Sequence, residues 1–491
     1  MGETRTVTRR GFLETAGVAT GAAIAVGTFD HPAIGKVNGA NDRLNFAILG
    51  TGGRAQVHIK VLRDMKDEGK PVDIVAVADV YEKNRVNAQT KTGAEQAEVD
   101  YRNVLDNDDV DAVVIATPDH WHARMAIDAM ESGKDVFCEK PMTHTIDEAR
   151  RVAETVRKTK QIFTVGVQST ADPKWRKANE LITAGRIGHV LQAHTQYYRN
   201  GSVGQWRYYA LTEDMSPKTV DWRMFLGVDF GLAPDMPFNR AKFAQWRCYW
   251  EFGGGMCTDL FVHQLTHLIQ AVGVHFPRRV VGGGGLYLEY DGRDVPDVAT
   301  VVADYDEGLQ IIVTATMCSE QYALPEVIHG HAASILFTGD GFDIKQEKLS
   351  NRPAPPGANQ TKAEEGVEHV RVEPPRDDTR AFWQHFLECV RSRNPETLCP
   401  ADTGYAAIAT VNMGVRSYRE GKALLFDKGT GEVCEADTSW ARRWEERSQL
   451  RGKPNQVIGW HAGTEGSLLE PPAYQKLEGD WIDDKDPAEK A

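Results

Sequence analysis

A glycine-rich turn, Gly50-Thr51-Gly52-Gly53-Arg54-Ala55, directly follows the apolar run 44–49. In a Gly-x-Gly-x-x-Gly/Ala turn, Gly50 would make the tight bend, Gly52 would let the backbone approach a pyrophosphate, and Ala55 would permit close helix–strand packing. The helix that follows offers free N–H groups and its positive dipole end to phosphate. The motif alone is weak, but strand and helix flank it here, so we predict a dinucleotide site that includes Gly53 and Arg54.

A carboxylate closes the second apolar run, in Ala76-Val77-Ala78-Asp79. At that position Asp79 would accept hydrogen bonds from the adenosine ribose and would repel a 2′-phosphate. We therefore expect NAD rather than NADP. The alternative role of Asp79, as a helix cap, is compatible with ribose binding.

The segment Thr117-Pro118-Asp119-His120-Trp121-His122 closes another strand and opens a helix. Thr117 and Pro118 are expected to line the cofactor cleft, and we group His120 with them. Metal binding by His120 and His122 is an alternative, but capping and local packing is the favoured role for this pair.

Glu139-Lys140-Pro141 ends a further strand, and Gln168 follows the next one. A lysine beside the expected nicotinamide can donate a hydrogen bond to a substrate hydroxyl, and Pro141 stiffens the turn. The alternative is an ordinary surface Glu-Lys pair. Glu139, Lys140 and Gln168 are assigned to the cofactor side of the site.

Alternating strands and helices must position these residues. Strands are predicted at 44–50, 73–79, 112–117, 136–139 and 163–167, with helices at 120–132 and 146–159 between them. This alternation predicts an α/β fold with an N-terminal Rossmann doubly wound parallel sheet. Such sheets bind ligands beyond the carboxyl ends of their strands, where the candidate residues fall.

Longer alternating runs follow residue 168, at 190–198, 280–290, 299–304 and 309–315, with helices at 258–272, 380–392 and 403–420. They predict a C-terminal α+β domain with an open, largely antiparallel sheet. The segment 345–373 is expected to be a surface loop. The predicted organisation is 1–40 signal and linker, 41–168 NAD-binding domain, 169–425 substrate and oligomerisation domain, and 426–491 a polar, extended arm.

Taken together, the motifs resemble the Gfo/Idh/MocA family of glucose–fructose oxidoreductase, inositol dehydrogenase and the rhizopine catabolism proteins. The glycine turn, Thr-Pro-Asp-His and Glu-Lys-Pro stand in family order, as do Gly185-Arg186-Ile187-Gly188, Asp221-Trp222, Trp246-Arg247 and Gly253-Gly254-Gly255. The resemblance covers about residues 42 to 425.

The resemblance implies three catalytic residues. Lys140 matches the Glu-Lys-Pro lysine, and Asp259 and His263 match the family's acidic residue and histidine. His263 would take the hydroxyl proton, Lys140 would stabilise the developing alkoxide, and Asp259 would orient the substrate or the histidine. A spacing of four would place Asp259 and His263 on one helical face; an ordinary amphipathic helix is the alternative.

One position departs from inositol-dehydrogenase-like members, which often carry an acid three residues after the histidine. In this chain Thr266 occupies that position and is followed by His267. The absence of the acid weakens the case for polyol dehydrogenase specificity. Tyr197, Trp246, Arg247 and His267 are candidate substrate residues, although each could be structural. Asp259, His263 and His267 could in principle hold a metal, but we expect none because the family normally needs none.

Composition narrows the classes of function. A net charge of −13 over 491 residues argues against nucleic-acid binding, and no apolar run reaches the roughly 20 residues that span a bilayer. The seven cysteines show no metal-ligand spacing, and their scattered, odd number argues against a disulfide framework. A soluble enzyme acting on a small carbohydrate, as a homodimer or homotetramer by family resemblance, is the expected class.

The leader Arg9-Arg10-Gly11-Phe12-Leu13 precedes a weakly apolar stretch and is typical of twin-arginine export. We expect cleavage before residue 41 and a periplasmic or otherwise exported protein. Outside the cytoplasm no NAD pool recycles NADH, so the cofactor must be retained and restored in each turnover. A sugar or polyol oxidoreductase is expected first, a glycoside hydrolase using transient oxidation and elimination second, and a non-catalytic sugar-binding protein third.

Overall fold

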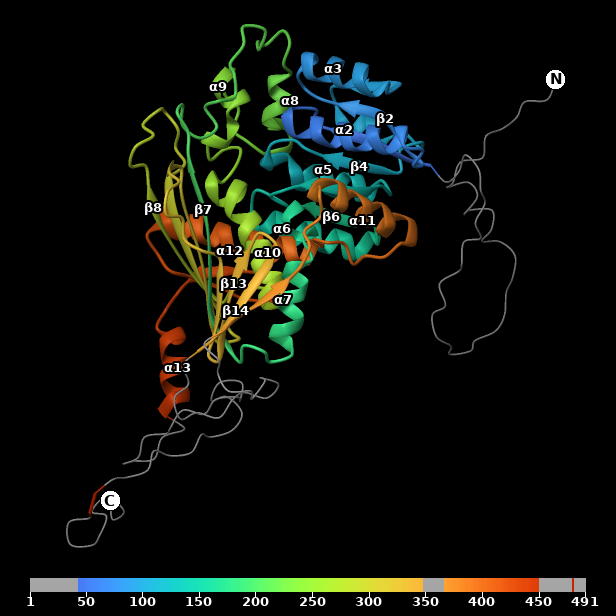
Figure 1. Ribbon diagram of the computed structural model, residues 1–491. Helices are drawn as coiled ribbons and strands as arrows, with labels where there is room; N and C mark the ends of the chain where they lie inside the picture. The colour runs from blue at the N-terminus through green and yellow to red at the C-terminus, as the bar shows by residue number, and fades with distance from the viewer. Residues whose placement is uncertain (1–42, 348–365, 450–478, 481–491) are drawn as a thin grey trace, which may run out of the picture.

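The computed structural model describes residues 43–347, 366–449 and 479–480, which form two sheets with their helices (Figure 1). The Arg9-Arg10 leader and most of the loop expected at 345–373 lie outside the described residues. No helix in the described ranges is long and apolar enough to cross a bilayer. All seven cysteines are free.

The first sheet is parallel throughout, with strand order β3-β2-β1-β4-β5-β6. Its strands are β1 Leu44–Leu49, β2 Val72–Ala78, β3 Gln96–Glu98, β4 Ala112–Ile115, β5 Asp135–Glu139 and β6 Phe163–Gly166. The predicted Rossmann sheet is confirmed. The strand order reverses between β1 and β4, and ligands bind at such a reversal.

Helices connect these strands, namely α2 Gly53–Asp67, α3 Glu82–Thr92, α4 Tyr101–Leu105, α5 Asp119–Glu131 and α6 Ile146–Thr159. The bounds of α6 follow from its sequence. Thr145 and Glu148 form a capping box at its start, and Ile146, Ala149 and Val152 recur at helical spacing on the buried face.

The second sheet follows η2 Gln168–Ala171 and α7 Lys174–Thr183 and runs in the order β15-β14-β13-β12-β7-β10-β9-β8-β16-β17, with β11 beside β7. Its strands are β7 Val190–Asn200, β8 Arg279–Gly285, β9 Val298–Tyr305, β10 Leu309–Thr316, β11 Cys318–Ser319, β12 Val327–Gly330, β13 Ala333–Thr338, β14 Gly341–Gln346, β15 Val367–Arg371, β16 Leu424–Phe426 and β17 Val433–Glu435. Within this second sheet, only β7 and β10 pair in parallel among the described strands, so the largely antiparallel prediction holds.

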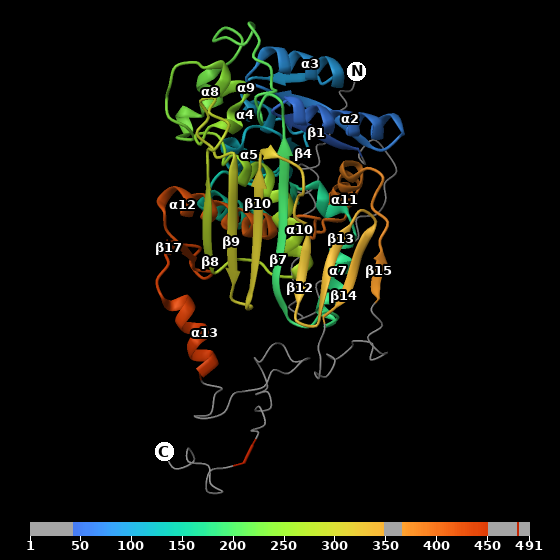
Figure 2. The ribbon, with the colours of Figure 1, turned by 60° about the vertical axis from the view of Figure 1, so that its left-hand side comes forward.

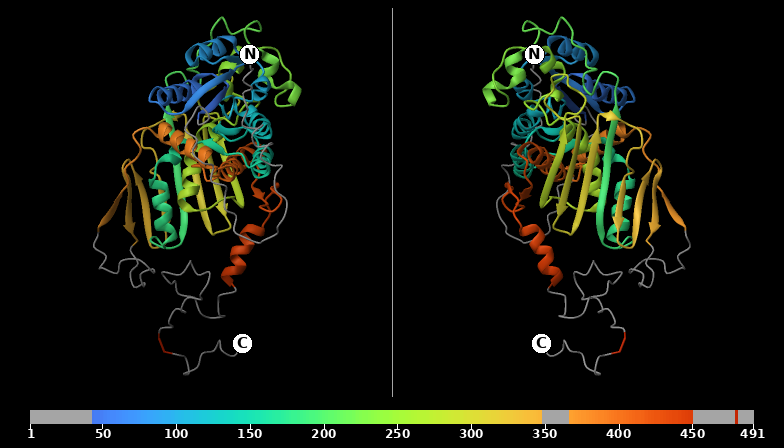
Figure 3. Two further views of the ribbon diagram at one scale, coloured as in Figure 1. Left: turned by 90° about the vertical axis from the view of Figure 1, so that its right-hand side faces the viewer. Right: turned by 90° about the vertical axis from the view of Figure 1, so that its left-hand side faces the viewer.

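Helices cover one face of this sheet. They include α7, the π-helical turn η5 Cys257–Phe261 that leads into α10 Val262–Val272, and α12 Ala401–Glu420. A Cβ at Gly282 of β8 would lie 2.0 Å from the carbonyl oxygen of Gly414, so glycine permits the close approach of α12. The opposite face points toward the viewer in Figure 2 without a covering helix of the described chain, and Figure 3 shows both sides.

Four short helices follow β7 in the chain, namely α8 Trp222–Leu226, η3 Val228–Phe230, α9 Arg240–Ala244 and η4 Trp246–Cys248. In Figure 2, α8 and α9 lie beyond the upper ends of the strands of the second sheet. A later helix, α11 Asp378–Ser392, returns to the first sheet. The indole of Trp383 stacks on Phe137 at a centroid distance of 4.6 Å and donates to Nδ1 of His58 at 3.0 Å. The two parts of the chain therefore share a packed interface.

Three predicted elements differ from the structure. The segment 345–373, expected to be a surface loop, contains the end of β14 and the whole of β15 within its described residues. The strand expected at 280–290 ends at Gly285, because the next backbone N–H groups, from Tyr287 to Glu289, donate to the carboxylate of Asp297. The arm expected to be extended beyond residue 426 instead begins with β17 and helix α13 Ser439–Gln449. In α13 the rings of Trp440 and Trp444 contact each other edge to face.

Candidate active site

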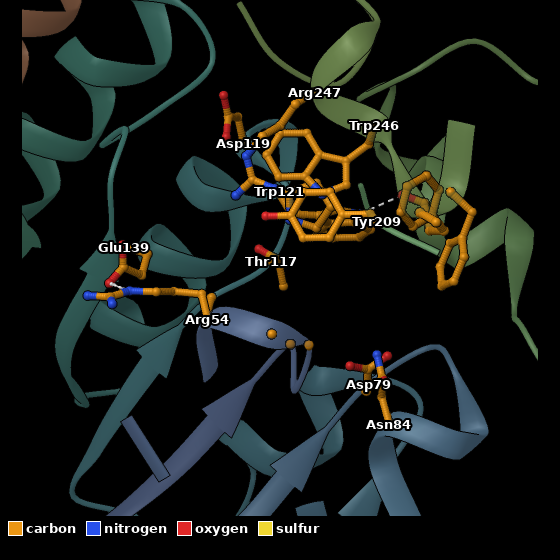
Figure 4. Close-up of a pocket in the computed structure, with 18 of the residues that line it drawn as sticks. Arg54, Asp79, Asn84, Thr117, Asp119, Trp121, Glu139, Tyr209, Trp246 and Arg247 are labelled. Atoms are coloured by element: carbon orange, nitrogen blue, oxygen red, sulfur yellow. Dashed lines mark hydrogen bonds and ion pairs between the residues drawn. The ribbon is translucent and has the colours of Figure 1, made fainter. Parts of the chain in front are cut away.

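A cavity of about 690 Å³ lies at the carboxyl ends of the first sheet and is closed by residues of the second domain. Figure 4 shows Arg54 and Glu139 on one side of it, Asp79 and Asn84 on another, and Asp119, Tyr209, Trp246 and Arg247 above. Most of the predicted site residues line it, namely Gly50, Gly52, Gly53, Arg54, Asp79, Thr117, Pro118, Glu139, Lys140, Gln168, Tyr197, Trp246, Arg247, Asp259 and His263.

The glycine turn forms the floor of the cavity. Gly50 has a φ of +79°, and a Cβ there would lie 2.7 Å from Cγ2 of Thr117, so only glycine fits. A Cβ on Gly53, the first residue of α2, would meet nothing within 4 Å. The backbone is therefore exposed at a helix N-terminus, which is the arrangement that binds a pyrophosphate. Ala55 is fully buried in α2, where the motif expects close packing.

Two polar atoms beside this turn are buried without a hydrogen-bond partner among the described residues. They are Oγ1 of Thr117 and Nη2 of Arg54, and both residues line the cavity. Buried polar groups are rarely left unsatisfied in proteins. A dinucleotide supplies the hydroxyl, amide and phosphate groups that would satisfy them, so the residues present fit such a cofactor.

Asp79 is held in place by the glycine turn. Its Oδ2 accepts from the N–H and the hydroxyl of Thr51, at 2.7 and 2.9 Å, and its Oδ1 accepts from the N–H of Tyr81 at 2.8 Å. Burial raises the pKa of Asp79. The N-cap residue of α3 is Tyr81, so Asp79 fixes the turn rather than capping the helix, and it lines the cavity where a ribose would lie.

Glu139 organises the side of the cavity next to the turn. Its Oε1 accepts from Arg54 at 2.6 Å and from Gln168 at 3.1 Å, and lies 2.9 Å from Nε2 of His58. Burial opposes ionisation of this carboxyl, but Arg54 and His58 outweigh burial and hold the pKa of Glu139 well below its usual range. Glu139 therefore positions Arg54 and Gln168.

Lys140 and Asp259 form a buried ion pair across the two domains. The ammonium of Lys140 donates to Oδ1 of Asp259 at 2.5 Å and to its carbonyl oxygen at 2.8 Å. The same Oδ1 accepts from Arg247 at 2.8 Å, and Oδ2 accepts from Trp206 at 3.0 Å. Burial opposes ionisation, but Lys140 and Arg247 hold the pKa of Asp259 well below its usual range. Asp259 is a permanent anion that orients both cations.

Asp259 was expected to orient the substrate or the histidine, and its bonds run to Lys140, Arg247 and Trp206 rather than to His263. Asp259 lies in the π-helical turn η5, while His263 lies one residue into α10. A π turn closes i→i+5 hydrogen bonds and is wider than an α turn, so residues four apart are not stacked one above the other. The carboxylate consequently reaches Lys140 and Arg247. Such turns are frequent at functional sites.

His263 lines the cavity beside this ion pair. Burial, and after it the charge of Lys140, lowers the pKa of His263 to about 3. The imidazole is therefore neutral at ordinary pH and has a free site to accept a proton.

Asp119 was not among the predicted site residues, yet it lines the cavity at the start of α5. Its Oδ2 accepts from the hydroxyl of Thr258 at 2.8 Å, and only 2% of the residue is exposed. Burial raises the pKa of Asp119 to about 6, against the opposing charges of Arg247 and Lys140. Its place directly after Thr117-Pro118, at a strand end, was a sequence signal for it.

Two predicted residues lie away from the cavity, which corrects their assignments. His120 packs among aromatic rings, and its Nε2 lies 2.9 Å from the carbonyl oxygen of Phe225. His267 stacks on Trp175 at a centroid distance of 3.9 Å, and its Nε2 lies 2.8 Å from Glu326. Both histidines are core residues rather than cofactor or substrate ligands.

Sequence reasoning also missed several lining or supporting residues of the second domain, of which four carry hydrogen-bonding side chains. Arg199, Tyr208 and Tyr209 line the cavity, and Trp206 is fully buried against Asp259. Arg199 shares a strand face with Tyr197, two residues before it, which was a usable signal. The other three lie in an irregular loop without periodicity. No group of three or more possible metal ligands occurs in the described part of the chain.

Two family models match the chain. One is described as an oxidoreductase family with an NAD-binding Rossmann fold and matches residues 44–167. The other is the C-terminal alpha/beta domain of the same oxidoreductase family and matches residues 179–425.

Individual proteins that are similar to the chain share 19% to 28% sequence identity with it. The chain is 25% identical to the scyllo-inositol 2-dehydrogenase (NAD(+)) of Bacillus subtilis (strain 168), over 78% of this chain and 96% of that protein. It is 28% identical to a glycosyl hydrolase family 109 protein of Shewanella baltica, over 44% of this chain and about half of that protein. The structure of a levoglucosan dehydrogenase with NADH and levoglucosan is similar in fold, with a TM-score of 0.58, 19% identity, and coverage of 78% and 98% of the two chains.

Proposed function

Because the chain belongs to the Gfo/Idh/MocA family of NAD-dependent oxidoreductases, we propose that it oxidises a hydroxyl of a sugar or polyol with a tightly retained NAD. The observation that carries this proposal is the buried Lys140–Asp259 pair, with His263 beside it, in the cavity that contains the dinucleotide turn. These are the groups that removal of a proton and a hydride from a carbinol requires.

The residues of the chain would divide the reaction between them. Bound NAD supplies the acceptor for the hydride that leaves the substrate carbon. The neutral imidazole of His263 accepts the hydroxyl proton as the carbonyl forms. Lys140 donates a hydrogen bond to the substrate oxygen and stabilises its developing negative charge. Asp259 acts as a positioning residue that holds Lys140 and Arg247.

Glycoside hydrolysis through transient oxidation is the second candidate, supported by the match to the glycosyl hydrolase family 109 proteins. The same residues would oxidise a ring carbon, and the acidified neighbouring C–H would then permit elimination. Simple oxidation is favoured, because the inositol dehydrogenase match extends over 96% of that relative and the hydrolase match over half.

One experiment separates the two candidates. Purified protein is analysed by mass spectrometry for bound nucleotide and then incubated with a panel of monosaccharides, polyols and aryl glycosides. Oxidation with a retained cofactor predicts a keto product and one NADH per protein when a single sugar is offered, and continued turnover only when a second sugar with a reducible carbonyl takes the hydride back. Hydrolysis predicts release of the aglycone without net NADH. Turnover of neither class by NAD-loaded protein would contradict both.

We also propose export through a twin-arginine signal, based on the Arg9-Arg10 motif outside the described residues. Export fits a retained cofactor, because a folded protein could carry its NAD across the membrane. Fractionation of the native host tests this, with Arg9→Lys/Arg10→Lys as the variant. Equal amounts of exported protein with and without the substitution would contradict it.

A further inference from the structure

Four cationic side chains line the cavity, Arg54, Lys140, Arg199 and Arg247. Three of them have a carboxylate partner. Arg54 pairs with Glu139 at 2.6 Å, and Lys140 and Arg247 both pair with Asp259. Arg199 differs, because its guanidinium forms no ion pair with any residue that the structure describes.

Arg199 is nevertheless fixed in position. It lies near the end of β7 and is half-buried. Its Nη2 donates to the hydroxyl of Tyr197 at 2.5 Å, and its guanidinium lies 4.6 Å from the centre of the same ring. Because the partner of this guanidinium is a hydroxyl rather than a carboxylate, no opposite charge among the described residues pairs with it, and several of its N–H donors are unused. Such a group is suited to an anion from outside the chain.

The position of Arg199 indicates which ligand carries this anion. The pyrophosphate and ribose positions lie at the glycine turn and at Asp79, on the first sheet, whereas Arg199 comes from the second. The strand that carries Arg199, β7, packs against η5, the turn that carries Asp259, and Arg199, Lys140 and Asp259 line the same cavity. Arg199 thus shares the substrate end of the cavity with the Lys140–Asp259 pair.

We propose that Arg199 binds an oxyanion of the substrate, so that the preferred substrate is a sugar bearing a carboxylate, sulfate or phosphate. This inference rests on the proposed function for its choice of a sugar. Arginine presents a planar pair of N–H donors that matches such groups. Tyr197 acts as the residue that orients the guanidinium toward the cavity.

Matched pairs of sugars test the inference by direct binding. Isothermal titration of the NADH-loaded protein compares glucose with glucuronate, galactose with galacturonate, and glucose with its phosphate and sulfate monoesters. We expect roughly 10- to 100-fold tighter binding of the anionic member of at least one pair, the range of a charge-assisted hydrogen bond. The pair that shows it identifies the source of the oxyanion. Equal or weaker binding of every anionic member would overturn the inference.

Substitutions assign the preference to one residue. In Arg199→Gln the ratio of the two dissociation constants should fall to near one, and Arg199→Lys should restore part of it. The exposed Arg371 of β15 provides the same substitution at a distance, and Arg371→Gln should retain the full ratio. A preference that survives in Arg199→Gln would overturn the inference. Circular dichroism of each variant verifies folding.

Turnover distinguishes this inference from the proposed function. Arg199-dependent binding of an anionic sugar, without oxidation of any sugar, would contradict the proposed function and leave the inference standing. Oxidation of neutral and anionic sugars with equal kcat/KM and equal affinity would overturn the inference and leave the proposed function standing.

Discussion

The Nζ atom of Lys140 lies 2.5 Å from Oδ1 of Asp259 and 2.8 Å from the carbonyl oxygen of the same residue. An ammonium has three N–H donors, so two are engaged and one is available to the cavity that Lys140 lines. A residue at the end of β5 is thus aimed by a residue of the second domain. This relationship makes catalysis depend on the packing of the two domains.

Lys140→Met should lower kcat by roughly 10²- to 10³-fold, the usual effect of removing one donor to a developing oxyanion. NADH affinity should change little, because the glycine turn and Asp79 do not contact Lys140. Steady-state kinetics and nucleotide titration measure the two effects. A loss confined to NADH affinity, with normal kcat at saturation, would show that Lys140 serves the cofactor only.

His263→Gln should lower kcat by roughly 10²- to 10⁴-fold as the proton acceptor is lost. Burial lowers the pKa of His263 to about 3, while Asp119 titrates at about 6. We therefore expect any acid limb in kcat/KM near pH 6 to belong to Asp119, whose ionised form faces Arg247. The limb should persist in His263→Gln and disappear in Asp119→Asn. The reverse pattern would reassign the titration to the histidine.

Asp119 should also make stability depend on pH. Its pKa is raised from 3.8 to about 6, so the folded state binds the proton more tightly than the unfolded chain. The stability that Asp119 contributes is complete at pH values below its pKa in the unfolded chain. That stability is lost as pH rises through its pKa in the folded protein. As pH rises from 3.8 to about 6, the free energy of unfolding of Asp119→Asn should therefore rise relative to that of the wild type by about 3 kcal/mol.

Urea denaturation at a series of pH values measures that difference. The exposed Asp147, with 84% of its side chain accessible, provides the control Asp147→Asn, which should show no such trend. A constant difference between Asp119→Asn and wild type across the interval would mean that Asp119 is not a buried, raised carboxyl.

Asp79→Asn should weaken NADH binding by about 10- to 100-fold, the range expected when a hydrogen bond to a charged group is lost. NADPH binding should weaken less, because the repulsion between the carboxylate and the 2′-phosphate disappears as well. Fluorescence titration of nucleotide-free protein gives both dissociation constants. An unchanged ratio of the two would place the ribose away from Asp79.

Much of the first domain could be predicted because its signals are local. The helix predicted at 146–159 matches α6 at both ends, since the capping box of Thr145 and Glu148 defines its start. The edge strand Gln96–Glu98 was missed because a strand of three residues, Gln-Ala-Glu, is too short to show a periodicity. The parallel pairing of β7 with β10 was also beyond prediction, because alternation is the same in parallel and antiparallel strands.

The site residues likewise divide into those with a local sequence signal and those without one. Residues at strand ends of the first sheet were identified, since their position relative to a cofactor follows from the topology. The partners that orient them come from distant segments. Asp259 reaches Lys140 from η5, and Asp259 itself is held by Trp206 of an irregular loop and by Arg247 of η4. His267 was misassigned because periodicity shows which residues share a face but does not show what covers it.

Transfer of deuterium from substrate to cofactor shows whether the protein oxidises a sugar with its bound NAD. Purified NAD-loaded protein is incubated with perdeuterated glucose, galactose, inositol and the corresponding uronic acids in ordinary water, and the nucleotide is recovered for mass spectrometry. We expect one deuterium on the nicotinamide ring in wild-type protein and strongly reduced labelling in Lys140→Met. Consumption of a deuterated sugar with no label in the nucleotide would contradict it.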